Sequence, residues 1–354
     1  AGEAGPAGAG ESAAAVRQAT LEWDDRDRAG LKLRRRARMR WEGAPRRVLV
    51  VYKWKEPQVE AVAREVAAWL QGRGVQVCVE RQAADSSPHW SSCEVFCKTK
   101  PCVDLAVALG GDGTLLHLAS LFGGQHDRHA ALPPCLSFAM GTLGFMTSFD
   151  ISRYAATLER VLDPATDQYL TLRARLRCEV RPAQGGGGDS GGAVHHCLNE
   201  VVLDKGANPG LGSLDCFVDG SPITTVKSDG LIISTPSGST GYNSAVGGPM
   251  VAPSVPCTIL SPIAAASLSF RPIVIPEAST IRIDVPADAP YPGRAIFDGH
   301  STHIIQAGGS LLVEPAVYPL PMINLRRYDR DWFHGLTDKL LWNKSQLPRA
   351  SPVG

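Results

Sequence analysis

The chain has 354 residues, of which 44% are hydrophobic, so it is long enough for two domains that each bury their own core. Its 36 basic and 35 acidic residues nearly cancel, which excludes the strong uniform charge typical of proteins that bind nucleic acids or membrane surfaces. We therefore expect small-molecule ligands, with neither nucleic acid nor membrane as a partner.

The nine cysteines are odd in number and contain no CxxC pair, which argues against a disulfide scaffold and for a reducing compartment. We therefore expect a cytoplasmic location. A chloroplast location stays open, because the sequence begins with Ala rather than Met and a removed targeting segment would not be seen.

The first 45 residues predict a disordered or regulatory basic segment. Residues 1–20 are rich in Ala and Gly and too poor in large apolar side chains to offset the entropy of ordering. From Lys32 to Arg47 there are eight basic residues and one acid, Glu42, with Met39 and Trp41 interleaved. This pattern is typical of a solvated linker, and it also makes calmodulin or another acidic partner a candidate.

Residues 46–165 have the pattern of an α/β domain. An amphipathic helix is predicted over 58–71, and it ends at Gly72. Short apolar strands are predicted at 47–52, 75–80, 103–109 and 135–139. Strands that alternate with helices favour a Rossmann-like parallel sheet with right-handed crossovers.

Residues 166–320 change to strands without intervening helices, which predicts a C-terminal antiparallel β-rich domain. The strands are expected at 170–180, 197–204, 214–219, 230–234, 280–285, 295–298 and 310–314. Asp219-Gly220 and Asp298-Gly299 are turn signals, and the Gly185 to Gly188 run is predicted to be a flexible loop tip. The tail, residues 321–354, becomes helical from 329 to 342 and is expected to pack back on the α/β domain.

The sharpest motif is Val107-Ala-Leu-Gly-Gly-Asp-Gly-Thr-Leu-Leu-His117, a buried strand that runs through a Gly-rich turn into a helix. Such a turn lets backbone N–H groups approach phosphate oxygens at a helix N-terminus. Asp112 would repel bare phosphate, so it is expected to accept a proton from a hydroxyl nucleophile or to hold a divalent cation. Both roles indicate phosphoryl transfer to an alcohol.

The alternative is a tight turn in which Asp112 only caps the helix. Other nucleotide motifs do not fit the segment. No Gly-Lys-Ser/Thr follows as in a Walker loop, Leu116 stands where a dinucleotide fingerprint has its third glycine, and protein-kinase signatures are absent.

Further motifs follow in order, and the set resembles the NAD kinase family, especially its eukaryotic and plant-like branch. Gly110-Gly-Asp-Gly-Thr114 is also found in diacylglycerol and sphingosine kinases and, in part, in phosphofructokinases. The motifs that resemble NAD kinases alone are Asn199-Glu200, Thr224 to Tyr242, Gly247-Gly-Pro249, Ser261-Pro262, Leu268-Ser-Phe-Arg-Pro272 and Phe297-Asp-Gly299. The resemblance runs from about Val48 to Asn343, with Asp331-Trp-Phe333 and Leu341-Trp-Asn343 near its end.

The resemblance implies transfer of a phosphoryl group from ATP to the 2′-hydroxyl of the adenosine ribose of NAD, giving NADP and ADP. Asp112 resembles the general base, or a ligand of Mg²⁺ or Mn²⁺ held with ATP. The other implied site residues are Gly111, Gly113 and Thr114 near phosphate, Asn199 and Glu200 at a ribose, Asp229 near nicotinamide, Thr240, Gly241 and Tyr242 near adenosine, Phe145 against a base, His117 and Lys227 as cations near phosphate, and Asp298 near the nucleotide.

Each implied role has a structural alternative. Asp298-Gly299 is also an ordinary hairpin turn, Asn199-Glu200 a strand end, Lys227 a solvated residue, Tyr242 a core residue and His117 an exposed helical residue. Family members commonly have Thr at the position of Ser237 and Ala at that of Gly241, so dinucleotide affinity is left open.

We expect direct in-line transfer without a phosphoenzyme, since no activated nucleophile lies beside Asp112 in the sequence, and we expect a homo-oligomer. Two alternative functions remain. One is a lipid kinase of the diacylglycerol or sphingosine type, and the other is a non-catalytic NAD-sensing module.

Overall fold

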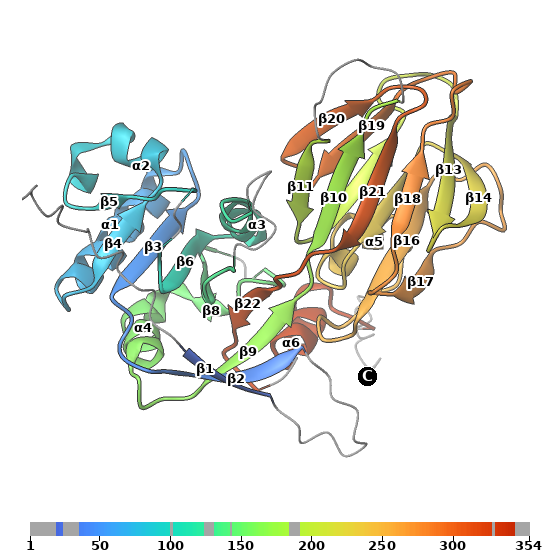
Figure 1. Cartoon of the computed structure of the whole chain (residues 1–354). Helices are drawn as coiled ribbons and strands as arrows, with labels where there is room; N and C mark the ends of the chain where they lie inside the picture. The colour runs from blue at the N-terminus through green and yellow to red at the C-terminus, as the bar shows by residue number, and fades with distance from the viewer. Residues whose placement is uncertain are drawn as a thin grey trace, which may run out of the picture.

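The computed structural model describes residues 19–23, 35–99, 102–123, 131–141, 144–183, 192–327 and 330–343. They form a ten-stranded sheet with helices on both faces, beside a β-rich body of two six-stranded sheets (Figure 1). The expected fold class, an α/β domain followed by an antiparallel β-rich domain, is confirmed. The Gly185 to Gly188 run and residues 1–18 lie outside the described residues.

The parallel part of the first sheet has the strand order β7-β6-β3-β4-β5, with β8 beside β7. These strands are β3 (Arg47–Tyr52), β4 (Gln76–Val79), β5 (Glu94–Val95), β6 (Leu105–Gly110), β7 (Cys135–Ala139) and β8 (Phe149–Asp150). Val48 and Val50 of β3 point to one face, and Leu49 and Val51 point to the other, as the two-residue repeat of a strand requires. Both faces are buried, which explains the continuous apolar run in the sequence.

Four helices cover this sheet: α1 (Pro57–Gln71), α2 (Arg81–Ser86), α3 (Asp112–Ser120) and α4 (Tyr154–Leu162). α1 begins with Pro, which suits the first helical position because its missing N–H would have no helical partner there. Its buried residues recur every three to four positions: Val59, Ala63, Val66, Ala67 and Leu70. α1 and α4 share one face of the sheet, and α3 lies on the other.

Four further strands extend the first sheet in the order β1-β2-β9-β22-β7. They are β1 (Ala19–Trp23), β2 (Arg36–Trp41), β9 (Gln168–Arg173) and β22 (Leu320–Ile323). The strand expected over 170–180 is therefore two strands, because the chain leaves the first sheet after Arg173 and enters the second body as β10 (Leu176–Arg181). The expected domain start at 166 thus places one strand of the first sheet in the wrong body.

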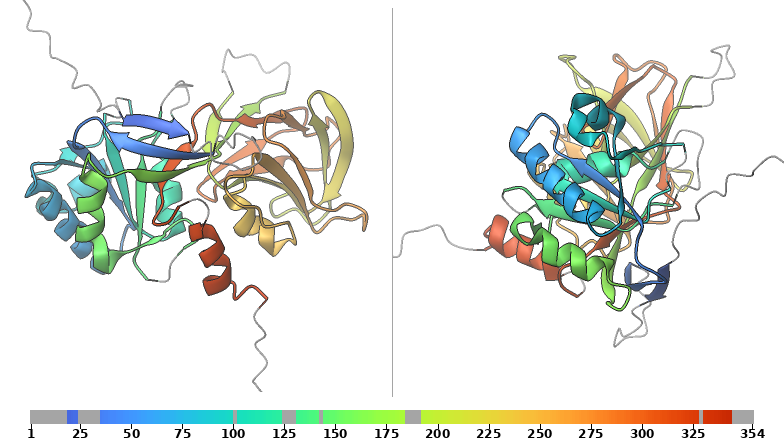
Figure 2. Two further views of the ribbon diagram at one scale, coloured as in Figure 1. Left: turned by 90° about the horizontal axis from the view of Figure 1, so that it is seen from below. Right: turned by 90° about the vertical axis from the view of Figure 1, so that its left-hand side faces the viewer.

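After β22 the chain forms α6 (Arg330–Lys339), which lies on the same side of the first sheet as α4 (Figure 2). Residues of both helices line one cavity, together with the turn at Gly144. The expected helical tail is therefore present over most of its length, against the first body.

The basic segment is not a solvated linker over residues 36–41, where the expectation is wrong. Its strand β2 pairs with β1 and β9, and Ala37, Met39 and Trp41 are buried in the first core. The Trp41 indole N–H donates to the carbonyl of Val161 at 2.8 Å. Because the burial alternates, the arginines of the strand point away from the core.

Several described arginines of this segment form ion pairs within the fold. Arg40 lies 2.6 Å from the Asp167 carboxylate, and Arg35 forms an ion pair with Glu277 of the β-rich body. Binding this segment as a calmodulin target would therefore require β2 to leave the sheet.

Deletion of residues 1–41 is expected to abolish folding or to lower the thermal midpoint by more than about 10 °C. The deletion removes buried side chains such as Met39 and Trp41, and losing a buried side chain of this size costs about 2 to 5 kcal/mol of a total of about 5 to 15. Deletion of residues 1–18, which removes no residue of β1 or β2, is the control. Equal midpoints for both deletions, measured by circular dichroism, would contradict this assignment.

The β-rich body consists of two antiparallel sheets that share one core. The first contains β11 (Val194–Cys197), β10, β21 (Ser310–Pro315), β18 (Ile281–Asp284), β13 (Gly212–Val218) and β14 (Ser221–Ser228). The second contains β17 (Ile273–Pro276), β16 (Cys257–Ile263), β15 (Gly230–Ser234), β12 (Glu200–Asp204), β19 (Gly293–Phe297) and β20 (Ser301–Ile305). In the described part of the chain, no helix is both long and apolar enough to cross a membrane.

Candidate functional site

The Gly-rich turn lies between β6, which ends at Gly110, and α3, which begins at Asp112. A Cβ at Gly110 would overlap the Thr114 side chain, so packing explains this glycine. A Cβ at Gly111 or Gly113 would meet no atom within 4 Å. These two glycines therefore leave open space where a phosphate could approach the backbone at the start of the helix.

The Asp112 carboxylate is held by a turn that is distant in sequence. Its Oδ2 accepts the N–H of Phe145 at 2.9 Å, and its Oδ1 accepts the N–H of Met146 at 3.1 Å and the hydroxyl of Thr147 at 3.3 Å. The N-cap position of α3 is Gly111, which makes no side-chain capping bond. The capping alternative for Asp112 is therefore not what the structure shows.

The turn that holds Asp112 is packed against α6. Lys339 donates from its Nζ to the Gly144 carbonyl, and this ammonium lies 5.0 Å from the centre of the Phe145 ring. A Cβ at Gly335 would lie 3.0 Å from Cδ1 of the same ring. The ring of Phe145, which was expected to lie against a base, thus contacts α6 in this structure.

Gly144→Ala is expected to lower kcat by roughly tenfold or more, because a Cβ at this position would overlap Oδ1 of Asp112 and displace the carboxylate. The control is Gly72→Ala, at a helix end with right-handed φ and ψ, where Ala is tolerated. Turnover and thermal midpoint are measured for both variants. Normal turnover in Gly144→Ala would show that the carboxylate position does not matter.

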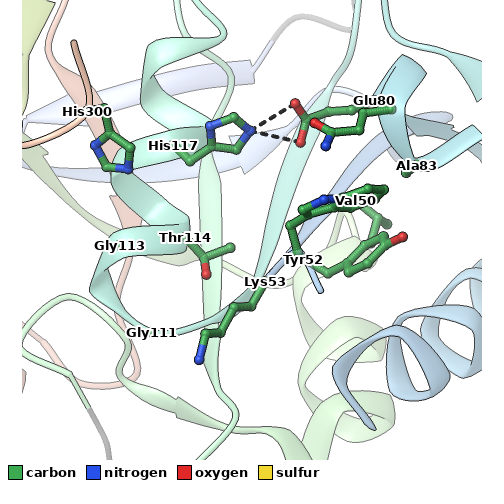
Figure 3. Close-up of a pocket in the computed structure, with 12 residues that line it drawn as sticks. Val50, Tyr52, Lys53, Glu80, Ala83, Gly111, Gly113, Thr114, His117 and His300 are labelled. Atoms are coloured by element: carbon green, nitrogen blue, oxygen red, sulfur yellow. Dashed lines mark hydrogen bonds and ion pairs between the residues drawn. The ribbon is translucent and has the colours of Figure 1, made fainter. Parts of the chain in front are cut away.

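The open side of the Gly-rich turn faces a cavity of about 380 Å³ (Figure 3). Its polar lining comes from Lys53, Glu80, Gln82, Thr114, His117 and His300, with Trp54 and the backbone of Gly111 and Gly113. Most of these residues lie in the first body, but His300 lies in the β19–β20 turn of the second. The cavity therefore lies between the two bodies.

Two histidines, one from each body, line this cavity. Nε2 of His117 lies 2.9 and 3.0 Å from the two Glu80 carboxylate oxygens, and His300 approaches from the opposite side (Figure 3). Nδ1 of His300 lies 2.6 Å from the Asp298 carbonyl, so this nitrogen carries a proton because a carbonyl only accepts. His117 is therefore oriented by Glu80 and is not simply a free surface residue.

A second polar cluster forms around Asp298. Its carboxylate accepts the N–H groups of Leu198, Asn199 and Glu200 at 2.7, 2.8 and 3.1 Å. Asp298 has φ 47° and Gly299 has φ 69°, so the pair does form the expected hairpin turn between β19 and β20. In addition to forming the turn, this carboxylate fixes the Asn199-Glu200 backbone.

The segment from Ser234 to Tyr242 packs on this backbone. The Thr235 N–H donates to the Asn199 carbonyl at 2.8 Å, and a Cβ at Gly241 would lie 3.6 Å from Oε2 of Glu200. Tyr242 is 44% exposed, so the core-packing alternative is wrong. Among the described residues, Oδ1 of Asn199 and Oε2 of Glu200 are buried without a hydrogen-bond partner, as expected where a polar ligand completes a site.

Burial raises the pKa of Glu200 from 4.5 to about 8, and the neighbouring Asp298 carboxylate contributes to this rise. Between these two pKa values, Glu200 is protonated in the native state and ionised in the unfolded chain. The free energy of unfolding is expected to fall as pH rises from about 4.5 to about 8, and Glu200→Gln should reduce this fall. Urea unfolding of both proteins at the two ends of this range measures the effect. An unchanged pH dependence in the variant would contradict it.

Lys227 and Asp229 do not join this cluster. In the β12–β15 pair, Glu200 lies opposite Ser234 and Asp204 lies opposite Gly230, so Asp229, five residues from Ser234, is about 17 Å away along the strands. The Asp229 carboxylate lies 2.7 Å from Nζ of Lys205, and Lys227 is exposed on β14. Within one chain, the structure separates these two residues from the Asn199-Glu200 pair.

Some lining residues escaped the sequence analysis, and each had a recognisable signal. Lys53 directly follows β3 and Glu80 directly follows β4, at the carboxyl ends of parallel strands, where ligands bind in open α/β sheets. His300 directly follows the Asp298-Gly299 turn.

The model of the ATP-NAD kinase N-terminal domain matches residues 48–166, and that of the ATP-NAD kinase C-terminal domain matches residues 198–325. An uncharacterized kinase of Schizosaccharomyces pombe is 33% identical over 84% of this chain and 80% of its own length. The chain belongs to the NAD kinase family.

Plant relatives of this family member are longer. NAD kinase 2, chloroplastic, of Arabidopsis thaliana is 36% identical over 86% of the chain and 31% of the relative. Probable NAD kinase 1 of Oryza sativa is 37% identical over 87% of the chain and 59% of the relative. The chain thus spans less than two thirds of the length of these relatives.

Two solved structures of NAD kinases share the fold. Yeast NADH kinase complexed with NADH has a TM-score of 0.77 and 28% identity, covering 89% of this chain and 93% of the yeast chain. An NAD kinase from Archaeoglobus fulgidus in complex with ATP has a TM-score of 0.62 and 22% identity, covering 83% of this chain and 98% of the archaeal one. At 22% identity, the similarity to the archaeal structure shows a shared fold alone.

Proposed function

We propose that the protein is an NAD kinase, which transfers a phosphoryl group from ATP to the 2′-hydroxyl of the adenosine ribose of NAD and gives NADP and ADP. The observation that carries this proposal is the Asp112 carboxylate, fixed by the 145–147 turn beside two glycines that open into the inter-domain cavity. Family membership and the likeness to a yeast NADH kinase bound to NADH support it.

Asp112 is proposed to take the proton of the ribose hydroxyl as the bond to phosphorus forms. A carboxylate has about four acceptor positions, and three hydrogen bonds from the turn fill most of them. The turn thus fixes the carboxylate while leaving room for one more donor. The ADP oxygen leaves on the opposite side of phosphorus, so the transfer is in-line and needs no covalent enzyme intermediate.

The donor phosphates are assigned to the cavity beside Gly111 and Gly113. The N-terminal end of α3 offers N–H groups and partial positive charge there, and Lys53 and His117 supply side-chain donors. Lys53 also lies 3.0 Å from Glu56, so its ammonium is held near the cavity by an exposed ion pair.

Mg²⁺ or Mn²⁺ is proposed to arrive with the donor. No group of three potential ligands among His, Cys, Asp and Glu is placed to hold a metal in the described part of the chain. This fits an ion held largely by phosphate oxygens and water, with at most one protein carboxylate such as Asp112. When bound, the ion neutralises the charge that develops on the phosphates.

NAD is assigned to the second cluster, with Asn199, Glu200 and Asp298 at a ribose and Thr240, Gly241 and Tyr242 around the adenosine. The buried, unpartnered oxygens of Asn199 and Glu200 support this assignment. The roles of Phe145, Lys227 and Asp229 remain part of the proposal, but their positions in a single chain give them less support.

The test is direct. The protein is incubated with ATP, Mg²⁺ and either NAD or NADH, and NADP(H) is followed with a coupled dehydrogenase. Turnover with either acceptor supports the proposal. Binding of NAD without turnover would favour the NAD-sensing alternative, and phosphorylation of diacylglycerol or sphingosine instead would favour a lipid kinase.

We further propose a homo-oligomer. β17 is an edge strand whose Ile273 and Val274 are 40% and 51% exposed, and an apolar edge of this kind is suited to pairing with a second copy. Light scattering after gel filtration tests this.

A calmodulin complex has less support, because the apolar residues of Lys32 to Arg47 that the structure describes are largely buried. A cytoplasmic location is proposed from nine free cysteines, with the chloroplast as the alternative.

A further inference from the structure

The two bodies are joined by two chain crossings that run side by side. One leads from β9 to β10 through Ala174 and Arg175, and the other leads from β21 to β22. The Ala316 N–H donates to the Arg175 carbonyl at 2.8 Å, so the two crossings are hydrogen-bonded to each other. Arg175 lies in this junction and is only 3% exposed.

The Arg175 side chain contacts the end of the helix that starts with Asp112. Its Nη2 donates to the Phe122 carbonyl at 2.9 Å, one residue beyond the C-cap of α3. The carbonyl end of a helix carries partial negative charge and favours a cation. A nine-residue helix is a rigid rod of about 14 Å, so a constraint at its end also constrains Asp112 at its start.

Packing at this helix end leaves little freedom. A Cβ at Gly123 would lie 3.0 Å from Nδ1 of His196 and 3.4 Å from Nη2 of Arg175. Burial, with the charges of Arg175 and Arg177 nearby, lowers the pKa of His196 to about 4. At neutral pH His196 is uncharged, so Arg175 supplies the positive charge at this contact.

The charge of the Asp298 carboxylate also acts on this guanidinium. Burial lowers the pKa of Arg175 to about 10, and the attraction of Asp298 opposes this lowering, so Arg175 stays charged at neutral pH. Asp298 in turn fixes the backbone of Asn199 and Glu200. One buried cation therefore bonds to the end of the helix that starts with Asp112 and interacts electrostatically with the cluster assigned to the dinucleotide.

We propose that Arg175 is a positioning residue, which holds the end of α3 against the Asp298 cluster and so sets the distance between Asp112 and the bound ribose. Its kinetic consequences rest on the proposed kinase activity. No atom of Arg175 needs to touch a substrate for this role. The hydrogen bond of Arg175 acts on Phe122 in the first body, and its charge acts on Asp298 in the β-rich body. Together they align Asp112 with the cluster assigned to the dinucleotide.

Arg175→Met is expected to lower kcat by about tenfold to a hundredfold, since a displacement of about 1 Å can cost a hundredfold in rate. The Kd for NAD should change less than about threefold, because Asp298 keeps its three backbone donors. Arg175→Lys keeps the charge but lacks the planar fork, so it should recover only part of the rate.

The matched control is Arg177→Met. Arg177 is a partly buried arginine two residues further along, with 12% of its side chain exposed, and its partners Glu179 and Glu314 lie in the β-rich body itself. This variant should lose stability and keep kcat at temperatures well below its midpoint. Arg175→Met with normal kcat would overturn the proposal. An equal loss of kcat in the control, or a rise in Kd that accounts for the whole effect, would also overturn it.

Hydrogen–deuterium exchange tests whether Arg175 holds the end of α3, and this measurement does not depend on enzymatic activity. Amides at the end of α3, residues 118–123, should lose protection in Arg175→Met and not in Arg177→Met. If the wild-type protein fails to phosphorylate NAD, the proposed function is wrong, but this exchange result still tests the role of Arg175. If Arg175→Met does not fold, Arg175→Lys is measured in both assays, and wild-type kcat with unchanged protection there would overturn the proposal.

Discussion

Asp112→Asn is expected to lower kcat by about a hundredfold to ten-thousandfold while NAD still binds. A ribose hydroxyl is a poor nucleophile at neutral pH, and the amide cannot take its proton. The structure adds a structural cost to this change. The carboxylate accepts from Phe145, Met146 and Thr147, and an Asn amide would turn an N–H₂ group toward one of these donors. Some loss of stability should therefore accompany the loss of rate.

The matched control separates the two effects. Thr147→Val removes a donor to Asp112 and the acceptor of the Gly144 N–H at 2.6 Å, but it keeps the carboxylate. If Asp112 is the base, this variant should lose stability to a similar degree and retain most of its turnover. If Asp112→Asn has nearly normal turnover, Asp112 acts only in the turn. Recovery of its rate at high Mg²⁺ would instead make Asp112 a metal ligand.

The regular elements of the first body could be predicted from the sequence because their periodicity is strong. The limits expected for β3 and α1 differ from those observed by at most one residue. The pattern of β2 was equally clear, since Arg36, Arg38 and Arg40 alternate with buried residues. Its high charge led to the linker interpretation, although two-residue alternation is the stronger indication of a half-buried strand.

Other features had no local signal. β9 and β10 form one continuous alternating run, and the break at Ala174 and Arg175 exists only because the chain changes sheets there. β14 was missed because five of its eight residues are exposed in a row, so it shows no alternation. The separation of Asp229 from Glu200 depends on strand register, which spacing along the chain does not reveal.

The candidate site was easiest to predict where one short motif carries it. Gly111 and Gly113 line the cavity, whereas the contact of Asp298 with the backbone of Asn199 and Glu200 was not predicted. The turn that holds Asp112 lies more than 30 positions away in the sequence. It binds the carboxylate mainly through backbone N–H groups, which nearly every residue type provides. Contacts of this kind leave no residue signature, so they require the structure.

Asp298→Ala is expected to weaken NAD binding by about a hundredfold, because it leaves the N–H groups of Leu198, Asn199 and Glu200 without their acceptor. Each unsatisfied buried donor costs about 1 to 3 kcal/mol, so the backbone should rearrange rather than keep its position. Asn199 and Glu200 would then lose the orientation that their side chains need at the ribose. The Kd is measured by calorimetry, with kcat compared at saturating NAD.

The control for this change is Asp219→Ala. Asp219 also begins an Asp-Gly hairpin turn with positive φ, 50°, and its Oδ1 accepts the Thr280 N–H at 2.8 Å, but this turn joins β13 and β14. Both substitutions impose the same backbone strain on Ala, so the strain cancels in the comparison. If Asp298 is only a turn residue, the two variants should lose similar stability and bind NAD equally well. If it holds the dinucleotide site, only Asp298→Ala should lose NAD affinity, because only its carboxylate reaches across to a second strand that carries the ligand-facing pair.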